Sequence, residues 1–150
     1  MTVSPVTRAL ASVLLGLGLV PGLLPVPAVV PAADAVTYHH WGRAAAPDQV
    51  LRRGCRNYRY HYRVNAPTNS WLVEIFLVSP TGKGLGYQVL NSQDGVDPPK
   101  GRRHFRVCRS STVPGRHKLR MKVTWYYPSD LEHTPHTGWV RPTYFRLTRP

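Results

Sequence analysis

Residues 117–126 read HKLRMKVTWY, and residues 57–65 read NYRYHYRVN. In both stretches, polar and apolar side chains alternate at every second position. In the earlier stretch the tyrosines fall on one face, and Arg59, His61 and Arg63 fall on the other. A period of two is typical of a β-strand with one buried face. The two stretches therefore predict strands whose exposed face carries a basic stripe.

Further strands are expected between turns rich in glycine and proline. The apolar run Trp71–Val78 predicts a central strand that is covered on both faces, and a first strand is expected somewhere between residues 36 and 53. Shorter alternating segments follow at residues 85–89, 104–109 and 144–149. Residues 91–103 and 127–142 are predicted to be long loops. No segment has a helical period, so the sequence predicts an all-β fold, an antiparallel β-sandwich of six to seven strands.

The first 35 residues are predicted to be a signal peptide for secretion. Arg8 precedes the uncharged stretch 9–20, which together resemble a basic n-region and an apolar h-region. Small residues flank Asp34, which predicts cleavage after Ala35 and a single mature domain over residues 36–150. An uncleaved membrane anchor is the alternative, although four prolines in the second half of the apolar segment disfavour a continuous helix. The predicted location is extracellular or associated with the cell envelope.

The predicted export bears on the state of the two cysteines, because thiols outside the cytosol usually form disulfides. We therefore predict a bridge between Cys55 and Cys108, with free cysteines as the alternative. Cys55 shares its strand face with Arg59, and Cys108 shares its face with Arg106. If both strands run unbroken, the bridge lies off the central core or near the strand ends. A β-bulge would instead place it in the core.

Cys55, Trp71 and Cys108 follow the order and approximate spacing of the Cys…Trp…Cys pattern of immunoglobulin-like domains. On these residues, the region from about 50 to 150 resembles a secreted bacterial immunoglobulin-like β-sandwich. The resemblance implies a buried bridge and a role as a recognition or spacer module. The chain departs from the family at Arg106, where the family has a tyrosine two residues before the second cysteine.

The sequence contains no nucleophile elbow, no phosphate-binding glycine loop and no dinucleotide fingerprint. Glu132, His133 and His136 are candidate metal ligands, but catalytic zinc needs three protein ligands plus water and structural zinc needs four. Asp130 or a distant histidine would have to complete such a set. Glu74 is expected to be a rim residue paired with an arginine, with a catalytic carboxylate as the alternative. We therefore predict no enzymatic activity and no cofactor, and keep a metal-dependent hydrolase as the alternative.

Charge is the strongest functional signal, because 20 Lys and Arg residues face only 7 Asp and Glu residues and give a formal net charge of +13. A second basic stripe runs along residues 118–122. If both stripes share one sheet, six basic side chains cover one face, and arginines near residues 102–109 would extend it. The predicted polyanion-binding residues are Arg59, His61, Arg63, Arg102, Arg103, Lys118, Arg120 and Lys122.

Such a face attracts polyanions most strongly at low salt. The expected partners are anionic cell-envelope polymers or an anionic lipid surface. Sequence-specific binding of nucleic acid is not expected, because no helix that could read a DNA groove is evident. An inhibitor or effector that binds a protein through the loops at residues 91–103 and 127–142 is a further alternative. A basic surface that has no dedicated partner is another alternative.

Overall fold

The computed structural model describes residues 36–150 except 94, 96, 130–131 and 133. The predicted signal peptide, residues 1–35, lies outside the described residues. Almost all regular structure is β, and a single turn of 3-10 helix spans Arg109–Ser111. Within the described ranges, no helix has both the length and the apolar character needed to cross a membrane.

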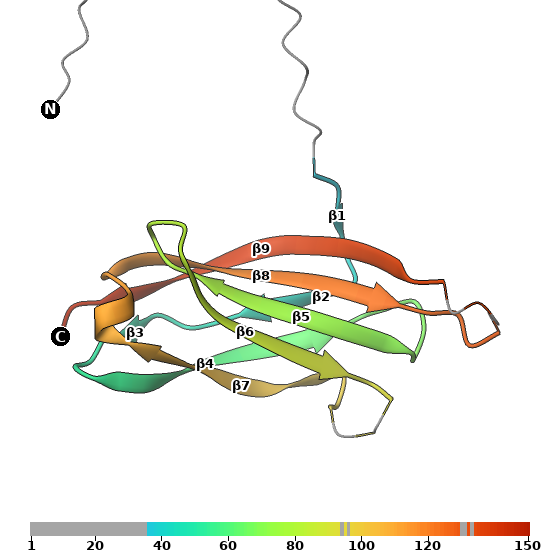
Figure 1. Cartoon of the computed structure of the whole chain (residues 1–150), viewed down its shortest axis with the longest axis horizontal. Coiled ribbons are helices and arrows are strands. Elements are labelled where there is room, and N and C mark those ends of the chain that lie inside the picture. The colour runs from blue at the N-terminus through green and yellow to red at the C-terminus, as the bar shows by residue number, and fades with distance from the viewer. Residues whose placement is uncertain (1–35, 94, 96, 130–131, 133) are drawn as a thin grey trace, which may run out of the picture. The chain divides into compact units, whose positions relative to one another are not determined.

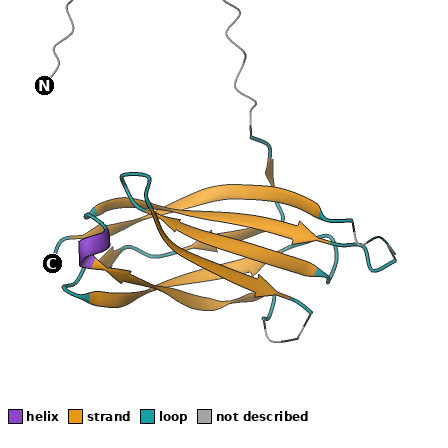
Figure 2. Ribbon diagram, in the orientation of Figure 1, coloured by secondary structure: helices purple, strands orange, loops and turns teal. Residues whose placement is uncertain are grey.

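Two sheets form a β-sandwich (Figure 1; Figure 2). The larger sheet has the order β1-β9-β8-β5-β6, and β3 also pairs with β9. β1 and β3 run parallel to β9, and the other pairs are antiparallel. The strands of this sheet are β1 (Tyr38–His39), β3 (Gln49–Val50), β5 (Trp71–Val78), β6 (Gly84–Asn91), β8 (Gly115–Trp125) and β9 (His136–Thr148).

The smaller sheet has three antiparallel strands in the order β2-β4-β7. They are β2 (Gly42–Ala45), β4 (Cys55–Val64) and β7 (Lys100–Cys108). Because β1 and β3 belong to the larger sheet, the chain crosses from one sheet to the other and back within residues 38–50. β4 and β7 pair without a register shift over their shared length.

The apolar face of each main strand lies in the core between the sheets. The alternation predicted this correctly for β4, in which Tyr58, Tyr60 and Tyr62 are all buried. A buried tyrosine needs a partner for its hydroxyl. These hydroxyls contact the Arg52 N–H, the Gln88 side chain and the Pro98 carbonyl, respectively. From β8, Leu119, Met121 and Val123 complete the facing side of the core.

Side chains fasten the edges of the two sheets to each other. Gln88 on β6 donates from Nε2 to the carbonyl of His104 on β7 at 2.7 Å. On the opposite side, the Gln49 amide donates to the carbonyl of Arg59 and accepts its N–H, both at 3.1 Å. The side-chain amide of Gln49 therefore takes the place of a paired strand for the β4 backbone at Arg59, beyond the point where β2 ends. The hydroxyl of Thr143 on β9 also donates to a carbonyl of β2.

The described residues form nine strands, three of them short, where the sequence predicted six to seven. β7 begins at Lys100 and β9 begins at His136, inside the predicted loops 91–103 and 127–142, so both loop boundaries were wrong. β9 contains Pro142, which lies where the register with β8 shifts. Proline is tolerated at such an irregularity because no ladder hydrogen bond is required from it.

The prediction that β5 is covered on both faces was also wrong. Its inward residues are buried, but its outward residues are only half-buried: Leu72, Glu74, Phe76 and Val78. Neighbouring strands supply the partial cover. The Phe76 ring lies 5.0 Å from that of Tyr87 on β6 and 5.8 Å from that of Trp139 on β9. The outer face of the larger sheet therefore carries apolar and aromatic side chains, and no further layer built from the described residues covers them.

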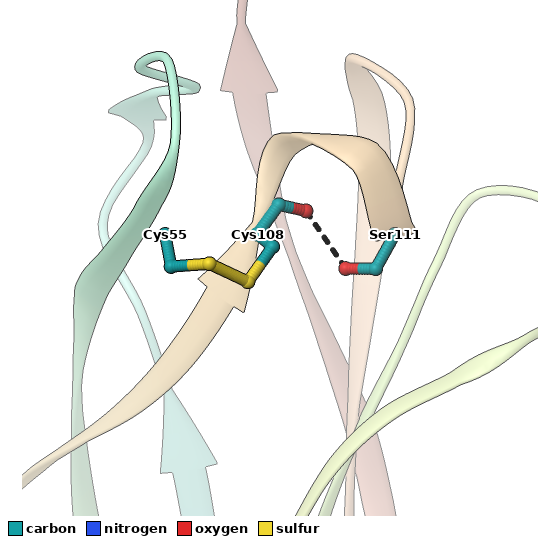
Figure 3. The surroundings of a disulfide bond; sticks show 3 residues. All are labelled: Cys55, Cys108 and Ser111. Carbon is teal, nitrogen blue, oxygen red and sulfur yellow. Dashed lines mark hydrogen bonds between the residues drawn. A yellow bond between two sulfur atoms is a disulfide. The ribbon is translucent and has the colours of Figure 1, made fainter.

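The predicted disulfide is present and joins two neighbouring strands of the smaller sheet (Figure 3). Cys55 opens β4 directly opposite Cys108 at the end of β7, with the Cα atoms 3.8 Å apart. Cys55 is exposed, so the bridge lies at the strand ends, as the side-chain parity predicted for unbroken strands. The buried bridge implied by the immunoglobulin resemblance is wrong. Trp71 belongs to the other sheet.

Candidate polyanion-binding site

The outer face of the smaller sheet carries basic side chains from all three strands. We call this set the cationic face: Arg43 on β2; Arg59, His61 and Arg63 on β4; and Lys100, Arg102, His104 and Arg106 on β7. All eight residues are exposed. The other outward positions of these described strands are Ala45, Asn57 and the two bridged cysteines. These strands therefore present no acidic side chain on this face.

All but one of the basic residues of the cationic face lie opposite another basic residue, and the exception is Arg106, which lies opposite Asn57. Arg63 faces Arg43 on one side and Lys100 on the other, and His61 faces Arg102. Directly opposite Cβ atoms lie about 5 Å apart, and alternate residues of one strand lie about 6.7 Å apart. Both spacings are shorter than the Debye length of about 8 Å at physiological ionic strength. The charges therefore act as one positive surface.

The two ion pairs described lie off this surface, one between Arg103 and Asp97 at 2.7 Å and the other between Lys122 and Glu74 at 2.8 Å. Like charges at opposite positions in a sheet destabilise it, each pair by roughly 0.2–1 kcal/mol. An anion bound across the strands would relieve this repulsion.

The disulfide holds the strands that carry the face in register. Counting inward from Cys55 and Cys108, every second pair of residues points outward, which places Arg59 opposite His104 and then His61 opposite Arg102. A slip of one residue would turn every side chain of a strand to the other side. Since the bridge lies at the end of this ladder, it fixes the alignment of the basic residues.

Four of the predicted residues lie on the cationic face: Arg59, His61, Arg63 and Arg102. Arg103 does not. It is half-buried on the opposite side of β7, where its guanidinium donates to Asp97, and it lies 6.0 Å from the Tyr62 ring centroid. Asp97 also accepts the N–H of Asn91, so this pair fastens the β6–β7 connection.

The second basic stripe lies on the other sheet. Lys118, Arg120 and Lys122 belong to β8 and point outward from the larger sheet. The condition for one six-residue face, that both stripes share a sheet, is therefore not met, because β4 and β8 belong to different sheets of the sandwich (Figure 1). Glu74 pairs with Lys122 and not with an arginine. The hydrogen bond from Lys122 holds the pKa of Glu74 below its ordinary value, and the bond from Tyr87 acts in the same direction.

Of the other four residues of the cationic face, Arg106 was among the arginines expected to extend it, and the sequence analysis missed the remaining three: Arg43, Lys100 and His104. Lys100 was assigned to a loop, and the strand that holds Arg43 has only four residues. The sequence did contain a signal from which two of these residues could have been placed. Treating the two cysteines as directly opposed cross-strand neighbours would have given the full β4–β7 register, and with it Lys100 and His104.

The candidate metal ligands do not form a metal site within the part of the chain that the structure describes. Glu132 is exposed, His133 lies outside the described residues, and His136 opens β9 with its ring stacked on Trp125 at 4.2 Å. Among the residues that the structure describes, no three potential ligands lie close enough to hold a metal ion.

No protein-family model matches this chain, and the search of curated proteins also found no match. The geometry of the cationic face is therefore the basis on which a function can be inferred.

Proposed function

We propose that this chain is an exported, non-enzymatic β-sandwich that binds anionic polymers of the cell envelope through the cationic face. The observation that carries the proposal is the set of eight exposed basic residues on three paired strands without an acidic neighbour on that face. A polyanion laid across it would displace its own counterions and gain affinity from their release. The disulfide supports an extracellular location, because such bonds persist in oxidising compartments.

The composition of the face favours a polymer over a lipid surface. Proteins that bind at membrane interfaces combine charge with apolar side chains that enter the headgroup region. The exposed large apolar side chains of the described chain all lie off the cationic face: Val36, Tyr38, Val50, Tyr87, Val89, Val113, Tyr127 and Tyr144. Apart from Ala45 and the disulfide, the cationic face offers charge and hydrogen-bond donors, which suits a hydrated, linear anion.

The test compares two variants that lose the same number of positive charges. The face variant carries Arg59→Gln, Arg63→Gln, Arg102→Gln and Arg106→Gln. The control variant carries Arg52→Gln, Arg53→Gln, Lys83→Gln and Arg149→Gln, which are exposed residues outside both sheets. Binding to dextran sulfate, to neutral dextran and to vesicles with an anionic lipid is measured by sedimentation at several salt concentrations.

We expect the parent and the control variant to bind dextran sulfate with a steep salt dependence and to ignore neutral dextran. The face variant should bind at least tenfold more weakly, with a salt slope reduced by up to four units, about one for each lost contact. Equal losses in both variants would mean that net charge alone drives binding and would overturn the proposal. Preferential binding to the vesicles would identify lipid as the partner instead.

We also propose that the sandwich is immunoglobulin-like. The order β9-β8-β5-β6 packed against β2-β4-β7 supports this, because immunoglobulin domains pack a G-F-C-C′ sheet on a sheet that contains strands A, B and E. The family bridge joins B to F across the sheets. Here the bridge joins the strands in the B and E positions, which would make it a variant of that arrangement. An experimental structure would test this order.

A further inference from the structure

A row of aromatic side chains crosses the outer face of the larger sheet. Tyr87 on β6 lies opposite Phe76 on β5, Phe76 lies opposite Arg120 on β8, and Trp139 on β9 lies opposite Tyr38 on β1. The Phe76 ring lies 5.0 Å from that of Tyr87 and 5.8 Å from that of Trp139. This face therefore differs in kind from the cationic face, because its charges lie among rings.

Two arginines of β8 are held against aromatic rings of β9. The guanidinium of Arg120 lies 4.0 Å from the ring centroid of Trp139, and that of Arg116 lies 3.8 Å from that of Tyr144. Stacking of this kind occupies one flat side of the guanidinium and leaves the N–H groups on its edge free to bind a carboxylate or phosphate in two places. It also limits the rotamers of a long side chain, so less entropy is lost when an anion binds.

A hollow of about 250 Å³ opens beside this pair of ring and cation. Its walls include Tyr38, Lys118, Arg120, Trp139 and Pro142. Lys118 lies on the same face of β8 as Arg120, two residues away, so both cations can reach one bound anion. Lys122, the next cation along the strand, is already paired with Glu74 and lies outside this set.

We propose that this hollow binds one acidic sugar residue. The carboxylate of the sugar would accept hydrogen bonds from Arg120 and Lys118, and the apolar side of the sugar ring would pack on Tyr38. The site goes beyond the proposed function because it lies on the other sheet and requires a ring as well as a charge.

The rings in the hollow favour a sugar over a stack of nucleic-acid bases. Proteins that bind single strands offer a series of free aromatic faces for successive bases. In this hollow, the Trp139 ring is already covered by Arg120. Tyr38 is 43 % exposed, so its ring is the one available to pack against the ring of a ligand.

The test titrates the full chain with glucuronic acid, glucose and inorganic phosphate, and follows binding by nuclear magnetic resonance. We expect glucuronic acid to bind more tightly than either of the others and to shift resonances of residues 38, 118, 120 and 139. Tyr38→Ala and Lys118→Gln should each weaken glucuronic acid binding about tenfold, which corresponds to one charge-assisted hydrogen bond or one ring contact. Arg102→Gln on the cationic face is the control and should leave it unchanged.

Equal affinity for phosphate and glucuronic acid, with no effect of Tyr38→Ala, would overturn the sugar site in favour of a bare anion site. An absence of glucuronic acid binding would overturn the proposal outright. Either result leaves dextran sulfate binding by the cationic face unaffected. Conversely, a failure of the protein to bind dextran sulfate would not change the result of the sugar titration. The two proposals can therefore be refuted separately.

Discussion

Removing one positive charge from the middle strand of the cationic face should stabilise the fold while weakening polymer binding. Arg63→Gln is the informative variant, because Arg63 faces both Arg43 and Lys100. Glutamine retains part of the side-chain stem and removes the charge. Two unfavourable pairs of roughly 0.2–1 kcal/mol each disappear. The free energy of unfolding should therefore rise by about 0.4–2 kcal/mol at low salt.

Urea unfolding followed by tryptophan fluorescence measures this change, since urea is uncharged and does not screen the face. In 1 M NaCl the Debye length falls to about 3 Å, and the stabilisation should largely vanish. Arg149→Gln, exposed beyond the end of β9, removes the same charge and should leave the stability nearly unchanged. The reasoning is refuted if Arg63→Gln is less stable than the parent at low salt, or if its affinity for dextran sulfate equals that of the parent.

Three further predictions concern the fold. Replacing both Cys55 and Cys108 by serine should lower the free energy of unfolding by about 4 kcal/mol, from the entropy of closing a loop with a sequence separation of 53, and a urea series on the purified variant measures this. Gly138→Ala would place a Cβ 2.3 Å from Cδ2 of His39; we expect a loss of about 1–3 kcal/mol and weaker protection of the β1 amides in hydrogen exchange. His117 is fully buried, and burial holds its pKa below the ordinary value of 6.5 although a backbone hydrogen bond to Gly115 opposes this. As the pH falls, the unfolded chain therefore binds a proton on His117 before the folded chain does. The contribution of neutral His117 to the free energy of unfolding is complete above pH 6.5 and is lost as the pH falls below that value. His117→Phe should therefore reduce the pH dependence of thermal stability measured from pH 7.5 to 5.5.

The side-chain alternation predicted which residues of β4 and β8 are buried, because the period of a strand is a local property of its backbone. It could not assign the two strands to different sheets. Strand order is decided by long-range packing, and Arg59 and Arg120 have the same local pattern whichever sheet they join. The sequence analysis therefore predicted that a basic face exists, but it assigned some residues to that face that lie elsewhere.

The start of β7 was missed for a different reason. Gly101 and the prolines before it are typical of a loop, yet Gly101 lies within the strand, opposite Tyr62. A Cβ at Gly101 would lie 2.8 Å from the Tyr62 hydroxyl oxygen. The glycine leaves room for the tyrosine ring, and this requirement arises from a residue 39 positions away in the sequence.

If the cationic face binds a polymer as proposed, the fastened edges of the sandwich affect how the protein behaves when many copies gather on one polymer. An open strand edge is a template for pairing with another chain, which leads to aggregation. Here β1 and β3 cover the two ends of β9, the Gln49 amide extends the cover of β4, and Gln88 ties β6 to β7. Crowding along a polyanion would then bring charged faces together while these contacts cover part of the strand edges, so we expect a densely coated polymer to keep its proteins as separate units.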